Sequence, residues 1–431
     1  MNTRTLSSGI GTSFQRSLMS PPSLKVEARE QAPQESFKEA RQEESTGPNL
    51  WKVLALGGLA ATALAGCTQG PSVPDPVVEV SGNQLTDQDG RTLYADDGID
   101  LAKDGTYLAG TSRGIHQGAI GGQSVKLTHE GRTLYADEGV ALNDSKQFVA
   151  GTSQGILVGN LEGESQMLTV NGRKVYPDEG VSINEKGQFI VGTTRGVVVG
   201  TVGNDDVRVL ELGGKTLYSD EGVTINEEGQ YIAGTTRGVV VGDIDDGSVR
   251  VLTDAQGRTL YSDEGNDINN QGQFIVGTTR GLAVGDVDDG TLRMLQSEGR
   301  QLYSDDGMDI NDQGQIVAGS TRGLFKTSYD SDDVTMLKVN DRQLYADDGI
   351  DDEDDEDPEW IDNLGVHLTE SGEYLAGTSR GWVVGNVATD DISFLEHDGH
   401  RLHPSDGGEL SESGQFVIGT SRGLFEGTIG N

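Results

Sequence analysis

Short hydrophobic runs alternate with polar turn signals along most of this chain. Between Gly222 and Thr253, four runs rich in β-branched residues are separated by Glu-Glu-Gly, Thr-Thr-Arg-Gly and Asp-Asp-Gly. Runs of this length and composition, bounded by glycine and acidic turns, are typical of β-strands joined by hairpins. The segment therefore predicts four antiparallel strands.

The same pattern recurs about every 42 residues, with one longer step after Asp341. Each repeat opens on a version of Gly-Arg-Thr-Leu-Tyr and continues with an acidic turn, an inner strand and two longer strands around a Gly-Thr-Thr-Arg-Gly turn. The repeats begin at Gly90, Gly131, Gly172, Gly214, Gly257, Gly299, Asp341 and Gly399. This period matches one four-stranded blade of a β-propeller. We therefore predict an all-β, eight-bladed propeller.

The last repeat ends at Gly427 without a fourth strand. The segment from Ser81 to Gly90 aligns with Ser248 to Gly257, where an inner repeat has its fourth strand, and it precedes the first complete repeat. We predict that this N-terminal strand completes the eighth blade. Such an exchange closes the ring and removes the sheet edges that an open array would expose.

The chain before the repeats divides into three segments. Residues 1–50 are rich in Ser, Gln, Glu and Pro without a sustained hydrophobic period, which predicts a disordered leader. Residues 51–67 form a hydrophobic signal or anchor segment, and residues 68–76 a linker to the propeller at 77–431. The apolar run is short for a membrane span and suits the hydrophobic region of a signal peptide.

The apolar segment ends in Leu-Ala-Gly-Cys, and Cys67 is the only cysteine of the chain. This ending resembles the lipobox of bacterial lipoproteins. The resemblance implies lipidation of Cys67 and a place in the bacterial cell envelope, as an outer membrane lipoprotein or extracellularly. An uncleaved anchor or a different export route is the alternative. A single cysteine also excludes an intrachain disulfide.

The charge balance favours some partners over others. The chain has 70 acidic and 32 basic residues and a net charge of −38. This charge repels the phosphate backbone, so we expect no nucleic-acid partner. It favours a protein partner with a basic surface, although a solvated acidic surface is the simpler interpretation. We expect a monomer.

Two charged turns recur on the same face of the predicted blades. The first is acidic, as in Asp220-Glu221, and the second carries an arginine in seven of the eight repeats. The arginines are Arg113, Arg195, Arg237, Arg280, Arg322, Arg380 and Arg422. Because a carboxylate and a guanidinium match in geometry, we predict structural ion pairs between the two turns. We also expect the repeated tyrosines, such as Tyr218, to pack between blades.

One repeat carries an insertion, from Asp351 to Gly365, in which nine carboxylates surround Trp360. It follows the acidic turn and therefore belongs to the face with the arginines. An aromatic anchor inside a charged rim is typical of a binding hot spot. Candidate partner-binding residues are Trp360, Asp354, Asp355 and Glu356. A solvated acidic loop is the alternative.

The opposite face carries Asp243, Asp245, Asp286 and Asp288 in tight turns. Carboxylate oxygens are the ligands that Ca²⁺ prefers, but these loops are short and Asp-Gly is a common hairpin turn. We therefore expect no cofactor, with Ca²⁺ at these residues as a weak alternative.

Three of the six histidines lie close together near the end of the chain. His397 and His400 flank Asp398-Gly399, a type I′ hairpin signal, and as cross-strand neighbours they could share a metal. His403 should point to the other face of the strand. A complete three-histidine site is therefore not expected.

The sequence lacks the short motifs of phosphate loops, serine hydrolases, zinc proteases and dinucleotide folds. It indicates a non-enzymatic interaction scaffold rather than an enzyme. The alternatives are a propeller glycan hydrolase or lyase, with carboxylates in the central channel, and a Ca²⁺-dependent, lectin-like binding module.

The stretches from Asp267 to Gly277 and from Asp309 to Gly319 read DINNQGQFIVG and DINDQGQIVAG. They resemble the HAF-type repeats of bacterial extracellular proteins. The resemblance covers this two-strand part of each repeat. It implies a propeller-like, exported protein and no catalytic residues.

Overall fold

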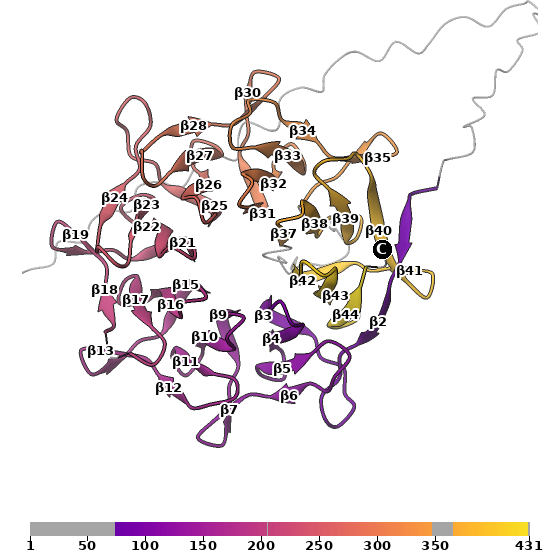
Figure 1. Ribbon diagram of the computed structural model, residues 1–431, viewed down its shortest axis with the longest axis horizontal. Coiled ribbons are helices and arrows are strands. Elements are labelled where there is room, and N and C mark those ends of the chain that lie inside the picture. The colour runs from indigo at the N-terminus through magenta and orange to yellow at the C-terminus, as the bar shows by residue number, and fades with distance from the viewer. Residues whose placement is uncertain (1–73, 205, 347–364, 430–431) are drawn as a thin grey trace, which may run out of the picture. The chain divides into compact units, whose positions relative to one another are not determined.

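A computed structural model describes residues 74–204, 206–346 and 365–429, which form eight β-sheets around a common axis (Figure 1). Within these ranges every regular element is a strand. No helix among them is long and apolar enough to span a membrane. The predicted eight-bladed propeller is confirmed.

Each blade runs outward from an inner strand near the axis, and its strands are antiparallel. The first four blades are β3 (Ala95–Leu101), β4 (Thr106–Thr111), β5 (His116–Ala119), β6 (Val125–Lys126); β9 (Ala136–Leu142), β10 (Gln147–Thr152), β11 (Leu157–Asn160), β12 (Ser165–Met167); β15 (Pro177–Ile183), β16 (Gln188–Thr193), β17 (Val198–Thr201), β18 (Arg208–Val209); and β21 (Ser219–Ile225), β22 (Gln230–Thr235), β23 (Val240–Asp243), β24 (Val249–Val251).

The remaining four blades repeat the arrangement, except that the eighth has three strands of its own. They are β25 (Ser262–Ile268), β26 (Gln273–Thr278), β27 (Ala283–Asp286), β28 (Leu292–Met294); β31 (Ser304–Ile310), β32 (Gln315–Ser320), β33 (Phe325–Ser328), β34 (Thr335–Met336); β37 (Val366–Leu368), β38 (Glu373–Ala376), β39 (Val383–Asn386), β40 (Ile392–His397); and β42 (Pro404–Leu410), β43 (Gln415–Thr420), β44 (Phe425–Thr428).

Small hairpins lead from several blades into the next one. They are β7 (Thr128–His129) with β8 (Arg132–Thr133), β13 (Thr169–Val170) with β14 (Arg173–Lys174), β19 (Glu211–Leu212) with β20 (Lys215–Thr216), β29 (Gln296–Ser297) with β30 (Arg300–Gln301), and β35 (Lys338–Val339) with β36 (Arg342–Gln343). In the seventh blade β40 itself turns into β41 (His400–Arg401).

The acidic turns are bulges inside the inner strands rather than free loops. In β21, Ser219 pairs with Thr235 and the next pair is Val223 with Ala233. The intervening Glu221 has φ 72°, in the left-handed region. A side chain at Gly234 on the partner strand would meet the Asp220 carbonyl at 2.2 Å, so only glycine allows this close approach.

The core lies between neighbouring blades. One buried cluster, for example, packs Ile190 and Val199 of the third blade against Tyr231 and Val240 of the fourth. These side chains are fully or almost fully buried. Because every blade buries the faces of its sheet against its neighbours, closure of the ring covers the two faces that an open array would leave exposed.

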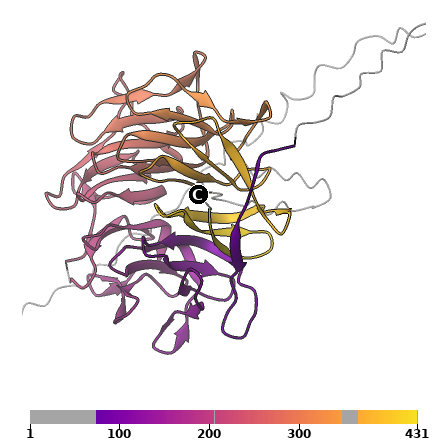
Figure 2. The same cartoon turned by 45° about the vertical axis from the view of Figure 1, so that its right-hand side comes forward.

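The N-terminal segment closes the ring across two blades. Strand β2 (Ser81–Gln84) pairs antiparallel with β44 and supplies the predicted fourth strand of the eighth blade. Figure 2 shows this indigo strand beside the yellow end of the chain. The preceding strand β1 (Val77–Glu79) pairs parallel with β40 of the seventh blade. The sequence did not predict this second attachment.

Asp75, in the predicted linker, anchors the start of this segment. Its carboxylate pairs with Arg380 at 2.8 Å and Arg401 at 3.1 Å, and it accepts a hydrogen bond from Asn340. Partial burial opposes ionisation of Asp75, but the hydrogen bonds from Asn340 and Arg401 outweigh it and lower its pKa. Contacts with the ring therefore begin within the segment expected to be a linker.

Candidate functional site

The next-to-last residue of each inner strand distinguishes the blades from one another. We call these the axial residues: Asp100, Ala141, Ser182, Thr224, Asp267, Asp309, His367 and Glu409. The titratable ones occupy five successive blades, the fifth to the eighth and the first. The other three blades carry small, uncharged side chains. The titratable axial residues therefore occupy one side of the ring, and the uncharged ones occupy the other.

The axial aspartates also tie neighbouring inner strands together. Asp100 accepts a hydrogen bond from the Leu142 backbone N–H at 2.6 Å. Asp309 accepts one from the Leu368 N–H at 2.7 Å. Each of these bonds uses the Oδ2 atom and joins one blade to the next. Part of the role of these carboxylates is therefore structural.

His367 is the centre of the charged half. Its Nδ1 lies 2.7 Å from Oε2 of Glu409 and 4.0 Å from Oδ2 of Asp309. The three side chains are 18 to 30% exposed, so they reach solvent. Burial opposes protonation of His367, but the charge of Glu409 and its hydrogen bond outweigh that effect and raise the histidine pKa to about 10. His367 is therefore an imidazolium at neutral pH.

The neighbouring carboxyls hold protons at unusually high pH. Burial raises the pKa of Asp100, and the nearby Glu409 charge adds to the effect. The Asp267 and Asp309 carboxyls are hydrogen-bonded to each other. Burial raises both of their pKa values, and the Asp267 charge raises that of Asp309 further.

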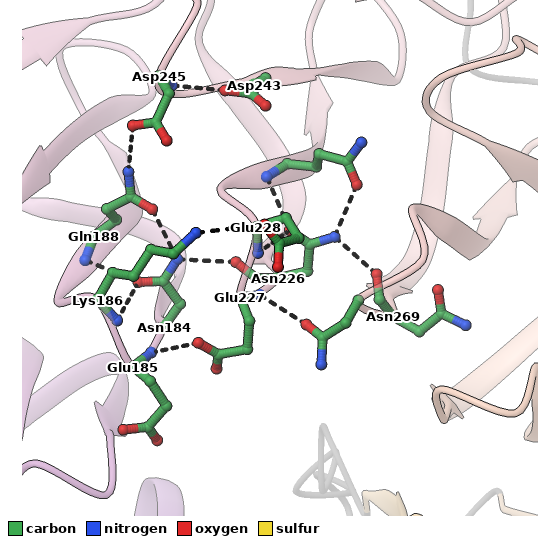
Figure 3. Close-up of polar contacts among 12 residues, drawn as sticks. Asn184, Glu185, Lys186, Gln188, Asn226, Glu227, Glu228, Asp243, Asp245 and Asn269 are labelled. Atoms are coloured by element: carbon green, nitrogen blue, oxygen red, sulfur yellow. Dashed lines mark hydrogen bonds and ion pairs between the residues drawn. The ribbon is translucent and has the colours of Figure 1, made fainter.

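A second polar layer lies where the inner strands turn into the second strands (Figure 3). Buried asparagines of five successive blades each donate from Nδ2 to a backbone carbonyl of the next blade, as Asn184 does to Asn226 and Asn226 to Asn269. One residue further, the Glu227 carboxylate accepts the Glu185 N–H at 2.9 Å. Ala102, Thr369 and Ser411 replace the asparagine in the other three blades.

The acidic turns face one another at the opposite end of the inner strands. Burial raises the pKa of Glu179, and the charges of Asp178 and Asp220 raise it further. Burial also raises the pKa of Glu221, and the charges of Glu179 and Glu264 raise it further. Neighbouring blades thus bring carboxylates, not arginines, next to these turns.

Three arginines of the ring have partners other than the acidic turns predicted for them. The ion pairs expected for the other four arginines remain a prediction. Arg322 pairs with Glu298 at 3.5 Å, Arg380 pairs with Asp75, and Arg113 donates to the Thr92 carbonyl. The physical reason is the bulge, which turns the acidic residues toward the next blade rather than toward their own arginine turn.

The repeated tyrosines also depart from the expected packing between blades. Seven of them are 42 to 48% exposed. They are Tyr94, Tyr135, Tyr176, Tyr218, Tyr261, Tyr303 and Tyr345. Their backbones lie against the arginine turns, since the Tyr218 carbonyl accepts the Thr236 N–H at 3.0 Å beside Arg237. We call the exposed tyrosines and the arginine ring together the tyrosine–arginine face.

The Ca²⁺ candidates on the other face have roles inside the protein. Asp243 and Asp286 accept hydrogen bonds from the backbones of their own turns, at 2.6 and 2.8 Å. Asp245 and Asp288 accept side-chain hydrogen bonds from glutamines of the preceding blade, at 2.7 and 2.8 Å. Cation binding at these residues remains a prediction.

Two other sets of predicted residues lie outside the described ranges. These are Cys67 in the hydrophobic segment and Trp360, Asp354, Asp355 and Glu356 in the insertion. Their proposed roles remain predictions.

The axial residues were not predicted, although the sequence contains a signal for them. Each lies two residues before the asparagine of the first turn, or before the residue that replaces it, as Asp267 does before Asn269. The flanking positions are apolar in most repeats, with Asn266 and Gly408 as exceptions, whereas this one reads Asp, Ala, Ser, Thr, Asp, Asp, His and Glu. Aligning the repeats and asking which position varies in charge would have identified it.

No protein-family model and no curated protein matches the chain. Two solved propellers are similar over most of its length. The Dos1 propeller has a TM-score of 0.54 and 12% identity and covers 83% of this chain and 95% of its own. The C-terminal WD40 domain of Sif2 has a TM-score of 0.54 and 10% identity, with 82% and 99% covered. The chain has a β-propeller fold.

Larger bacterial proteins match more loosely. The extracellular domains described for the one component system BT4673 and the hybrid two component system BT3049 of B. thetaiotaomicron have TM-scores of 0.41 and 0.46 and identities of 13 and 12%. They cover 80 and 81% of this chain. This chain spans 52 and 42% of theirs, about half the length of these matches. The HAF-type resemblance remains a prediction.

Proposed function

We propose that the chain is a non-enzymatic interaction scaffold that binds a protein partner on its tyrosine–arginine face. The observation that carries this proposal is the repeated exposure of one tyrosine per blade in seven of the eight blades, beside a turn that carries arginine in most of them. Tyrosine and arginine are enriched in the residues that dominate binding energy at protein interfaces. A rigid ring of blades holds these side chains at fixed spacing.

Charge indicates the kind of partner. The acidic turns begin two residues after the tyrosines, and burial together with the charges of neighbouring carboxylates raises the pKa of Glu179 and Glu221. A partner that places lysine or arginine over these turns would relieve that repulsion. We therefore propose a basic protein surface, whose association would be faster at low ionic strength. Trp360, Asp354, Asp355 and Glu356 remain candidate contacts on the same face.

The axial residues raise the alternative of a propeller hydrolase, but their geometry does not favour it. Retaining glycosidases hold two carboxyls about 5–5.5 Å apart and inverting enzymes hold them further apart. Asp267 and Asp309 are instead hydrogen-bonded directly to each other. Glu409 is engaged by His367 at 2.7 Å. These direct contacts differ from the separated pair of carboxyls that a glycosidase uses.

The test compares capture of partners by wild-type and altered chains. The first variant combines Tyr176→Ser and Tyr218→Ser with Arg195→Ala and Arg237→Ala, on two neighbouring blades. The control, Lys186→Gln with Glu228→Gln, removes an ion pair at the opposite end of the same blades. We expect crosslinked capture from cells that make the protein to lose its partners only for the first variant. Equal capture by both variants would contradict the proposal.

We also propose that the chain is exported and anchored in the bacterial cell envelope through lipid on Cys67, at the outer membrane or with its propeller extracellular. The support is the apolar segment that ends at the only cysteine. A lipidated chain would partition into membranes, and Cys67→Ser would release it into the soluble fraction. An intact mass that corresponds to the unmodified chain from Met1 would contradict the anchor and leave the interaction proposal unaffected.

A further inference from the structure

Closure of the ring brings together three potential metal ligands that are far apart in sequence. These are Glu79 at the end of β1 and His397 and Asp398 at the β40–β41 hairpin. One ligand atom from each lies within 4.8 Å of the others. Among the described residues this is the only group of three or more histidine, cysteine or carboxylate side chains so arranged.

The hydrogen bonds of His397 favour the tautomer that can bind a metal. Its Nδ1 lies 3.3 Å from the carbonyl oxygen of Val80, which can only accept, so Nδ1 carries the proton. The Nε2 atom then has its lone pair free and lies 3.6 Å from Oδ2 of Asp398. Histidine ligands of metals commonly donate their other N–H to a backbone carbonyl, which fixes the ring orientation. The Phe425 ring, 4.7 Å away between centroids, also holds the imidazole in place.

The two carboxylates are held by the backbone around them. Asp398 and Gly399 have φ values of 51° and 70°, as a type I′ turn requires. The Glu79 carboxylate accepts the Asp398 N–H at 2.6 Å, so this hydrogen bond already joins β1 to the hairpin turn. The Asp398 side chain is 88% exposed and free to rotate toward an ion.

We propose that Glu79, His397 and Asp398 form a binding site for Zn²⁺. One imidazole nitrogen and two carboxylate oxygens are ligands that zinc accepts at about 2.0–2.2 Å, and three protein ligands leave a fourth position for water. A histidine nitrogen in the set favours zinc over Ca²⁺ and Mg²⁺, which prefer oxygen ligands. Small movements of the exposed carboxylates would bring the three groups to bonding distance.

The bound ion would fasten the N-terminal segment to the seventh blade. Strand β1 has three residues and pairs only with β40. A metal shared between Glu79 and the hairpin would add a crosslink at the end of this short pairing. A ligand that binds only the folded state stabilises it by an amount that grows with the logarithm of its concentration relative to Kd. Zinc would therefore strengthen the closure of the ring.

The experiment measures Zn²⁺ binding to the full chain by calorimetry. Three variants each remove one ligand and keep its hydrogen bonds or turn: His397→Gln, Glu79→Gln and Asp398→Asn. We expect each variant to weaken Zn²⁺ binding by about tenfold or more. The control is His400→Gln, which alters the cross-strand partner of His397. It should bind zinc as the wild type does.

Two outcomes would overturn the proposal. The first is a wild-type chain that does not bind Zn²⁺. The second is a loss in His400→Gln as large as in His397→Gln, because the site would then be the histidine pair. A further readout is amide hydrogen exchange in β1, which Zn²⁺ should slow in the wild type and leave unchanged in Glu79→Gln.

Discussion

At the scale of single residues, the blades differ in charge where their inner strands approach the axis. His367 and its carboxylate neighbours occupy one side of the ring, and Ala141, Ser182 and Thr224 occupy the other. The flanking positions are apolar in most blades because they pack against the neighbouring blade, as Val223 and Ile225 do. The axial position has no such packing requirement, so its side chain can change in charge from blade to blade.

The raised carboxyl pKa values predict that stability falls as pH rises. Burial, with neighbouring acidic charges, raises the pKa of Asp406 to about 6 and that of Asp100 to about 8, from 3.8. The folded chain then holds protons that the unfolded chain releases, so this stabilisation is complete below pH about 4 and is lost through pH 6 and 8. Melting temperature measured from pH 4.5 to 9 should decrease.

The variant Asp100→Asn should flatten the upper part of this pH profile, because asparagine can still accept the Leu142 N–H. Glu162→Gln, at an exposed site, should leave the profile unchanged. A melting temperature that rises between pH 5 and 8 would contradict the assignment of protons to these carboxyls.

The buried asparagine layer provides a second prediction. The Asn226 side chain makes four hydrogen bonds, to Gln230 twice and to Glu228 and Asn269 once each. Asn226→Ala should lower the free energy of unfolding by about 2–4 kcal/mol, because it leaves buried polar groups without partners. Denaturant unfolding measures the change. Asn204→Ala, at an exposed site, should cost less than about 0.5 kcal/mol, and equal losses would refute the role of the layer.

At the scale of elements, the N-terminal segment is attached at three places. Asp75 pairs with two arginines that stack on Phe394, with guanidinium carbons 5.0 and 3.8 Å from the ring centre. Strand β1 then pairs with β40, and β2 pairs with β44. The short strands are marginal separately, and their attachment at successive points makes the closure cooperative.

Asp75→Ala should therefore weaken the closure without removing it. The lost charged hydrogen bonds should lower the free energy of unfolding by about 1–3 kcal/mol. Hydrogen exchange should speed up in β1 and β2 more than in the inner strands. Deleting residues 68–89 should have the largest effect on closure of the ring, because it exposes the edge of β44 and should promote aggregation. Unchanged exchange in β1 would show that Asp75 does not hold the segment.

At the scale of the whole molecule, the repeat pattern was enough to predict the propeller. Turn residues and β-branched runs are local signals, and their period predicts the number of blades. The absence of a fourth strand from the last repeat predicted that β2 would complete the eighth blade. Contacts between blades were not predictable in the same way. The bulge at Glu221 and the pairing of Asp75 with Arg380 depend on geometry that no local pattern contains.

The order in which the chain is made has a consequence for the closed ring. Gln84, in the closing strand, donates a hydrogen bond to the carbonyl of Arg422, 338 residues later. At roughly 5–20 residues per second, the closing strand waits about 20–70 s for its partner to be synthesised. Until then the ring cannot close through this strand. Strand β2 is synthesised early but is therefore among the last strands to pair. A chain released before β44 is complete could not close its ring.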